Sequence, residues 1–343
     1  MKLLTSRQPN KERLKATLLH ENPSEIPYWE AAIGKRNLAF LFGREDVPEL
    51  SWLVSPEEQL QIATATGQDV VTLWMFGPAP RVREPNGSLR CLEDGELTTW
   101  DQLDKIVPYT DEEIRAFVKP IERVFDVVAG TGVGVSVACG GSIWQKAWQL
   151  VGFEEFMSKT LTDPAFVERL IHHTAEPGVR AAKLLCEYPL TFLMVADNIS
   201  TTKGPFVSPD TLKSLWRPWA EKTIAPAKAK GIPAMLNTDG KIDWILDDIV
   251  EMGFDAINPV DPNGNDIFEV KELYGDRLCL VGGINQHWPL STGTPADVDR
   301  TVREYIDRLR GGGGYVVSSS HDIGENVVPA NWVAMIQAVE RYS

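Results

Sequence analysis

Polar residues with acid, base or hydrogen-bonding side chains follow several short apolar segments of this chain. Asn237 and Asp239 end the segment that begins at Ile232, and Asp197 ends an earlier one. His321 follows three consecutive serines near the end of the sequence. An imidazole in such a place can serve as an acid, a base or a metal ligand. Asp and Asn after a strand also commonly cap the next helix, so each of these side chains has a structural alternative.

Further candidates share the same kind of position, at the ends of apolar segments or just after them. They are Glu30, Ser142, Asn198, Asn258, Asp261 and Asn285. The aromatic residues Trp29 and Trp74 lie at two of these ends and can line a pocket for an aromatic ligand. Packing in the core is the alternative for both.

The apolar segments themselves are predicted to be eight buried parallel strands, because they lack the alternation of a half-exposed strand. They start near residues 26, 69, 133, 192, 232, 254, 278 and 314, with helical patterns between them. Strict alternation of strand and helix favours a (β/α)8 TIM barrel, in which all strand ends meet at one mouth. An open doubly wound sheet is the alternative, although Gly130–Gly134 precedes a strand, whereas a dinucleotide fingerprint follows one.

Two other segments complete the predicted fold, which we interpret as one barrel domain over residues 1–343. Residues 8–21 have helical spacing and are expected to form an N-terminal cover helix. Residues 77–128 form an insertion after the second strand: 77–110 are rich in Pro, Gly and charge and predict a hairpin or a lid, and 111–128 predict a helix.

Composition limits the classes of partner and compartment. The net charge of −14 argues against nucleic acid or an anionic membrane as a partner. The four cysteines are far apart and suggest free thiols in a reducing compartment. No apolar run reaches roughly twenty residues, and Met1–Arg13 lacks the apolar core of a signal peptide. A soluble, cytoplasmic protein is therefore expected.

Short motifs in the second half of the chain carry a resemblance to a known family. They are Asp197-Asn198, Gly204, Ser208-Pro209, Asn237-Thr238-Asp239-Gly240, Asn258-Pro259, Gly282-Gly283-Ile284, Gly293-Thr294-Pro295, Ser319-Ser320-His321 and Val328-Pro329-Ala330-Asn331. As a set they resemble the uroporphyrinogen decarboxylase-like superfamily, well over residues 190–343 and loosely before. The resemblance implies a (β/α)8 barrel. It also implies one of two activities, since the superfamily contains decarboxylases and cobalamin-dependent methyltransferases.

Departures from the family motifs separate these activities. The decarboxylases carry an Arg-Gln-Ala-Gly-Arg segment after the first strand, where this chain has Trp29–Arg36, with Glu30 in place of the first arginine. The thiol methyltransferases hold zinc with a His-x-Cys pair and a later Cys, where this chain has Asn237, Asp239 and His321. With two thiolates missing, only a loosely held zinc on Asp239 and His321 stays conceivable.

The branch that the chain then resembles most is the methyltransferase component of O-demethylase systems. Such proteins move a methyl group from an aromatic methyl ether, of guaiacol or veratrole type, to cobalamin on a separate corrinoid protein. The resemblance implies that this partner docks at the barrel mouth. Asp239 and His321 would supply general acid catalysis, Asn237 would position the ring oxygen, and Asp197 would bind a neighbouring phenol hydroxyl.

The expected substrate-binding residues complete this interpretation. They are Glu30, Trp29, Trp74, Phe76, Asn198 and Asn258, with the three aromatic side chains enclosing the ring. Two alternatives remain: a decarboxylase of uroporphyrinogen or another small carboxylate, and a non-catalytic barrel that binds an aromatic ligand or a corrinoid protein.

Overall fold

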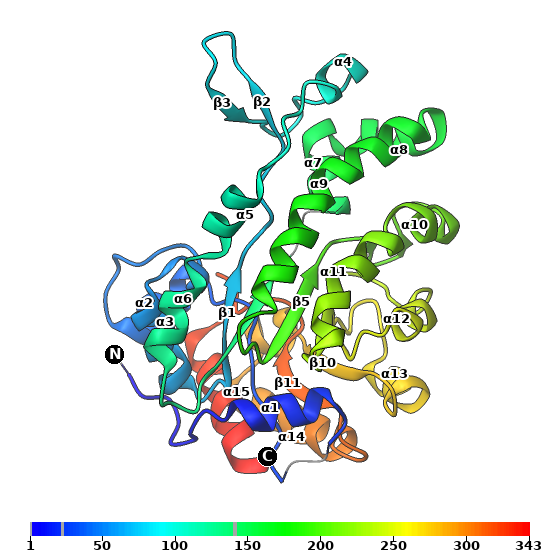
Figure 1. Ribbon diagram of the computed structural model, residues 1–343. Helices are drawn as coiled ribbons and strands as arrows, with labels where there is room; N and C mark the ends of the chain where they lie inside the picture. Colours follow the sequence, from blue (N-terminus) through cyan, green and yellow to red (C-terminus); the bar gives the residue numbers. More distant parts are fainter. Residues whose placement is uncertain (1, 22–23, 140–142) are drawn as a thin grey trace.

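Seven parallel strands form the curved sheet at the centre of the protein (Figure 1). The computed structural model describes residues 2–21, 24–139 and 143–343. In spatial order the strands are β1 (Val70–Trp74), β4 (Gly134–Ala138), β5 (Phe192–Ala196), β8 (Ala234–Asn237), β9 (Ala256–Val260), β10 (Cys279–Ile284) and β11 (Tyr315–Ser319). Every one of these neighbours pairs in parallel, so their carboxyl ends face the same way.

The segment around Tyr28 fills the eighth place, between β11 and β1. Tyr28 forms a parallel bridge with Val317, and the amide of Val317 donates to the carbonyl of Pro27 at 3.0 Å. On the other side, the amide of Asp69 donates to the carbonyl of Tyr28 at 3.3 Å. The predicted (β/α)8 fold class is confirmed. The strand predicted at 26–30 is reduced to this bridge, because Pro27 has no N–H for a regular ladder.

Helices lie around the sheet, apart from the first along the chain, which closes one end of the barrel, and the fourth, which belongs to the insertion. They are α1 (Lys11–Leu18), α2 (Lys35–Phe42), α3 (Pro56–Thr66), α4 (Trp100–Leu103), α5 (Asp111–Val118), α6 (Ile121–Val128), α7 (Trp144–Val151), α8 (Phe153–Thr162), α9 (Pro164–Leu185), α10 (Pro209–Leu215), α11 (Arg217–Ala229), α12 (Leu246–Met252), α13 (Ile267–Tyr274), α14 (Pro295–Leu309) and α15 (Pro329–Tyr342), with short turns η1 (Ser51–Leu53) and η2 (Gln286–Ser291). The helix predicted over 111–128 is two helices, since Pro120 cannot donate an amide at the break. Gly152, with φ of 96°, likewise separates α7 from α8.

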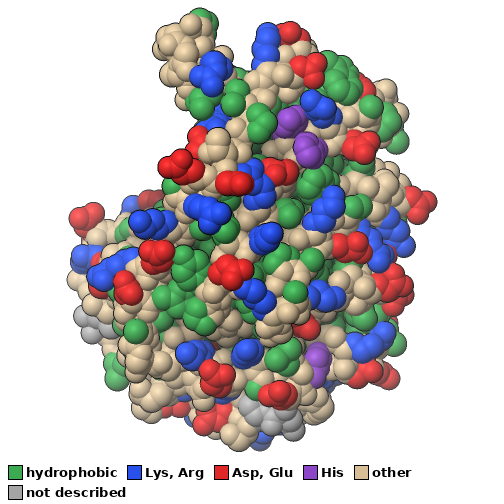
Figure 2. All heavy atoms as spheres, viewed as in Figure 1, with side chains coloured by type: hydrophobic (Ala, Val, Ile, Leu, Met, Phe, Trp, Pro, Cys, Tyr) green, Lys and Arg blue, Asp and Glu red, His purple; other side chains and the backbone are tan. Residues whose placement is uncertain are grey.

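The insertion after β1 rises beyond the carboxyl ends of the strands, and its outer end stands clear of the surface in Figure 2. Its β2 (Arg81–Arg83) and β3 (Leu89–Cys91) pair antiparallel, so the predicted hairpin is confirmed. The amides of Gly95 and Leu97 donate to carbonyls of α7 at 2.9 and 2.8 Å. These bonds attach the insertion to α7, and its role as a lid stays a prediction. A second, two-residue hairpin joins β6 (Ser200–Thr201) and β7 (Gly204–Pro205).

Helix α1 closes the opposite, amino-terminal end of the barrel, as predicted for a cover helix (Figure 1). Its Leu14 and Leu18 are buried against side chains from the barrel interior, among them Trp29, Met194 and Met235. No side chain in this group is more than 7% exposed. Burial of large apolar side chains here supplies the main stabilisation of the interior, because each contributes about 1.5–3 kcal/mol.

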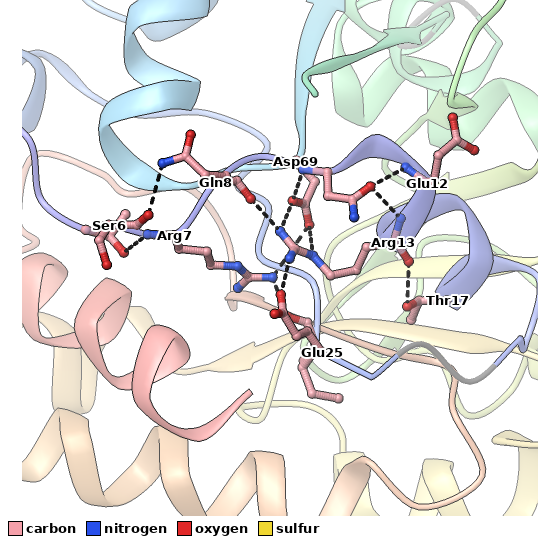
Figure 3. Close-up of polar contacts among 11 residues, drawn as sticks. Ser6, Arg7, Gln8, Glu12, Arg13, Thr17, Glu25 and Asp69 are labelled. Carbon is pink, nitrogen blue, oxygen red and sulfur yellow. Dashed lines mark hydrogen bonds and ion pairs between the residues drawn. The ribbon is translucent and has the colours of Figure 1, made fainter. Parts of the chain in front are cut away.

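A buried charge network ties α1 to the start of β1 (Figure 3). The Asp69 carboxylate accepts from Arg13 Nε at 3.2 Å and from the amide of Asn10 at 2.8 Å. Arg13 Nη2 forms a second contact with Asp69, and Arg7 Nη2 lies 3.8 Å from it. The Asp69 side chain is fully buried, so these cations balance a charge that water does not reach.

In residues 2–21, 24–139 and 143–343, no helix is both long enough and apolar enough to span a membrane.

Candidate active site

A cavity of about 160 Å³ lies at the carboxyl ends of the strands. It is lined by Ala31, Trp74, Phe76, Gln145, Ala196, Asp197, Asn198, Asn237, Asp239, Asn258, Pro259, His321 and Asp322. Eight residues expected at the site are therefore brought together here. Polar groups occupy the strand ends, and two aromatic side chains form one wall.

His321 lies between two carboxylates in this cavity. Its Nε2 is 3.6 Å from Asp239 Oδ2, and its Nδ1 is 3.5 Å from Asp322 Oδ2. Interaction with Asp239, followed by the negative fields of Asp322 and Asp261, raises the pKa of the His321 imidazole to about 9 against the opposing effect of burial. The ring is therefore an imidazolium at neutral pH and can donate a proton. About half of the side chain is exposed, so a ligand can reach it.

Three asparagine side chains lie beside His321 and Asp239 in the cavity lining, namely Asn198, Asn237 and Asn258. Asn237 Nδ2 donates to Asn258 Oδ1 at 2.7 Å, and Asn198 Oδ1 accepts from the amide of Asp239 at 3.1 Å. Among the described residues no hydrogen-bond donor contacts the side-chain oxygen Oδ1 of Asn237, so this oxygen is available to accept from a ligand. Asn198 instead holds the backbone that carries Asp239.

The aromatic wall consists of Trp74 and Phe76, whose ring centroids are 5.5 Å apart. Trp52 packs behind Trp74 at 4.9 Å, and Trp74 Nε1 donates to the carbonyl of Ala31 at 3.2 Å. Phe76 is 49% exposed. The rings are thus held in place by their neighbours while one of them stays open to solvent, which suits contact with a planar ligand.

Asp197 has a different role from the predicted contact with a phenol hydroxyl. Its carboxylate accepts from the amides of Trp144 and Gln145, each at 2.7 Å, and from Trp216 Nε1 at 3.0 Å. Burial raises its pKa to about 6, with these three donors opposing the shift. Asp197 therefore caps α7 and sets the Gln145 side chain in the cavity lining.

Replacing Asp197 with Asn is expected to destabilise the protein by about 1.5–3 kcal/mol, because an amide group would then face at least one buried N–H donor. Denaturant unfolding measures this loss. The matched control is Asp266→Asn, at the exposed cap of α13, where Asn caps as well as Asp and a change within about 0.5 kcal/mol is expected. Equal losses for the two variants would contradict the capping role.

Two predicted substrate-binding residues lie away from the cavity. Trp29 is fully buried in the barrel interior, where it packs edge to face on Phe192 and donates from Nε1 to Thr72 at 2.9 Å. Glu30 is buried behind Ala31 and lines a separate cavity of about 30 Å³. The side chains of Trp29 and Glu30 were predicted to lie at the barrel mouth, but both are buried inside the protein.

The other residues expected at the site are Ser142, Asp261 and Asn285. Ser142 lies outside the described residues. Asp261 accepts from the amide of Asn263 at 3.0 Å, and Asn285 caps η2. Three contributors were missed, namely Gln145, Asp322 and Trp52. Of these, only Asp322 carried a signal in the sequence, because it directly follows His321.

The residues named as possible zinc ligands do not fit a metal site. Asp239 lies 3.6 Å from Nε2 of His321, whereas the neighbouring Asp322 lies beside Nδ1, so Asp322 does not converge with the named pair on one point. No cluster of three His, Cys, Asp or Glu side chains with suitable geometry occurs in the part of the chain that the structure describes. The pair is better described as hydrogen-bonding and acid–base groups.

Comparison with known proteins decides the family. The family model described as uroporphyrinogen decarboxylase (URO-D) matches residues 92–342. The chain belongs to the uroporphyrinogen decarboxylase family. The uroporphyrinogen decarboxylase of Idiomarina loihiensis is 22% identical over 277 residues, which cover 78% of this chain and 72% of that protein. The counterpart from Methylococcus capsulatus is 30% identical over 113 residues, or 33% of this chain and 31% of its own.

The fold of this family member is shared with a solved structure of a methyltransferase from Methanosarcina mazei. The TM-score is 0.69 at 19% identity, over 100% of this chain and 99% of the other. The likeness therefore concerns the whole barrel and shows the fold. Within the uroporphyrinogen decarboxylase family, residues of the site itself must distinguish the activities.

Proposed function

We propose that this protein transfers a methyl group from an aromatic methyl ether to the cobalt of a corrinoid held by a separate protein. The observation that carries the proposal is the position of the His321 imidazole between two carboxylates, which favour its charged form, in a cavity with an aromatic wall. An ether is a poor methyl donor, because the departing phenolate must be stabilised. A positioned proton donor supplies that stabilisation.

The residues of the chain account for the proton and the ring. As the methyl carbon–oxygen bond breaks, its electron pair stays on oxygen, and His321 donates its proton to that oxygen. Asp239 and Asp322 hold the imidazolium in place and favour its charged form. Trp74 and Phe76 contact the ring face, while the side-chain oxygen Oδ1 of Asn237 accepts from a ring hydroxyl where one is present. When its carrier protein is bound at the mouth, the corrinoid would supply a strongly nucleophilic cobalt(I) as the methyl acceptor.

The position of the cavity suits a nucleophile brought by another protein. It lies at the carboxyl ends of the strands, and Phe76, Asp239 and His321 are each about half exposed. A bound methyl group beside His321 can therefore be approached from outside the barrel. The partner is expected to dock at this mouth.

Decarboxylation of a polycarboxylate is the competing activity, since the curated relatives are uroporphyrinogen decarboxylases. No lysine or arginine occurs among the described residues of the cavity lining. Lys35 and Arg36, near the place of the family's arginines, contact Glu49 at 2.7 Å and the Glu325 carbonyl at 3.4 Å instead. A polyanion would meet acidic side chains here, so the methyl ether is favoured.

Methyl transfer from guaiacol- or veratrole-type ethers is expected only when a reduced corrinoid protein is supplied. The assay follows phenol release and cobalt absorbance across a panel of methyl ethers, with and without the partner. Absence of turnover across the panel with the partner present would count against the proposal. Release of carbon dioxide from uroporphyrinogen without cobalamin would favour the decarboxylase. Binding of ethers with no reaction under either condition would favour a non-catalytic barrel.

A further inference from the structure

Glu30 is a buried carboxyl group that contacts the last two residues of β11, Ser318 and Ser319, shortly before His321 in the chain. Its Oε2 lies 2.6 Å from Ser319 Oγ and 3.3 Å from Ser318 Oγ. The amide of Ser319 donates to Glu30 at 3.1 Å. Ser319 Oγ also lies 2.7 Å from the carbonyl oxygen of His321. One hydroxyl therefore joins Glu30 to the residue that carries the proposed acid.

The number of protons in this chain of contacts limits the state of Glu30. A serine hydroxyl has one hydrogen to donate. The His321 carbonyl can only accept, so the Ser319 hydrogen must point there if the 2.7 Å contact is a hydrogen bond. The 2.6 Å contact then needs a hydrogen from Glu30. With an ionised Glu30, one of the two contacts would bring together oxygens with no hydrogen between them.

We propose that Glu30 is held as a neutral carboxylic acid and is a positioning residue that orients the His321 turn through Ser319. In this arrangement Glu30 donates to Ser319 Oγ, and Ser319 donates to the His321 carbonyl. The other Glu30 oxygen accepts from the Ser319 amide. Ser318 Oγ, at 3.3 Å, donates to a lone pair of the protonated oxygen Oε2. Each of these contacts then has one donor and one acceptor.

The surroundings of Glu30 favour the same protonation state. The titratable groups near it are Tyr28 on its own segment, Tyr315 on β11 and Asp322 beyond β11. No arginine or lysine is paired with it in the described residues. Burial, only partly opposed by the serine donors, raises the pKa of Glu30 from 4.5 to about 8.

Asp197 provides an internal contrast, since it is also a buried carboxyl at a strand end. Its three partners are N–H groups, which can only donate. Asp197 must therefore be an acceptor on both oxygens, whereas Glu30 must be a donor on one. Replacing each carboxyl group with an amide should therefore have different effects. Glu30→Gln keeps an N–H donor for Ser319 Oγ, whereas Asp197→Asn places its NH2 group against an N–H donor of the protein.

Infrared spectroscopy of the full chain tests the protonation state directly. We expect the carbonyl band of a protonated carboxylic acid at neutral pH in the wild type and in Asp197→Asn, and its loss in Glu30→Gln. Persistence of that band in Glu30→Gln, or its absence from the wild type, would overturn the proposal. This measurement needs neither substrate nor corrinoid.

Thermal unfolding against pH gives a second test with a defined sign. A folded-state pKa above the ordinary value means that the contribution of Glu30 to stability is fully present below pH 4.5 and is lost as pH rises to about 8. Glu30→Gln cannot ionise, so its Tm should rise relative to the wild type across this interval. A constant Tm difference would contradict a neutral Glu30.

The positioning role rests on the proposed function and is tested separately by rate. We expect Glu30→Ala and Ser319→Ala to lower kcat at least about tenfold with little change in KM, and Glu30→Gln to recover most of that loss. Equal kcat for Glu30→Gln and Glu30→Ala would overturn the positioning role. If the wild type transfers no methyl group, the spectroscopic and thermal results still decide the state of Glu30.

Discussion

Replacing His321 with alanine is expected to lower kcat for methyl transfer by about 10²–10⁴-fold, the usual contribution of a general acid. Substrate affinity should change less, because Trp74 and Phe76 remain to contact the ring. Steady-state kinetics with a guaiacol-type ether and a reduced corrinoid protein measures both quantities.

The pH dependence gives this prediction its sign. The acid form of His321 is required and its pKa is about 9, so kcat/KM should fall about tenfold per pH unit above that value. The residual activity of His321→Ala should lack this limb. His287→Ala is the matched control, since that histidine is exposed and lies outside the cavity lining. A wild-type rate retained by His321→Ala would refute the role of the imidazolium.

Substituting Asp69 by asparagine is expected to destabilise the protein by about 3–5 kcal/mol, because it leaves the buried guanidinium of Arg13, and that of Arg7 nearby, without their common counter-charge. Equilibrium unfolding in denaturant measures the loss. The control is Glu49→Gln, which breaks an exposed pair with Lys35 and should change the stability little, because solvent screens such pairs. Similar losses in both variants would show that the network of Figure 3 adds little.

The architecture could be predicted because buried parallel strands are continuous apolar segments with abrupt polar ends. The strand predicted to start near 192 begins at Phe192 as β5, and the strand predicted to start near 314 begins one residue later, at Tyr315, as β11. Where the prediction was wrong, single residues acted against the pattern. Pro27 limits the first strand to a bridge, and Pro120 divides the helix predicted over 111–128.

Strand ends also predicted which residues meet at the mouth, including Asp239, Asn237 and His321. The direction in which a side chain points was not predictable, because it depends on donors that are remote in sequence. Asp197 turns to amides 53 and 52 residues away, and Glu30 to serines nearly the whole chain away. Gln145, which lines the cavity, is held at its amide by Asp197.

The bridge between Tyr28 and Val317 also bears on the order of events during synthesis. Its two partners come from near opposite ends of the sequence, so the barrel cannot close until β11 has left the ribosome. Until then Glu30 faces water and lacks the serines that surround it in the finished protein. Its uptake of a proton therefore belongs to the last stage of folding, when the His321 turn is assembled.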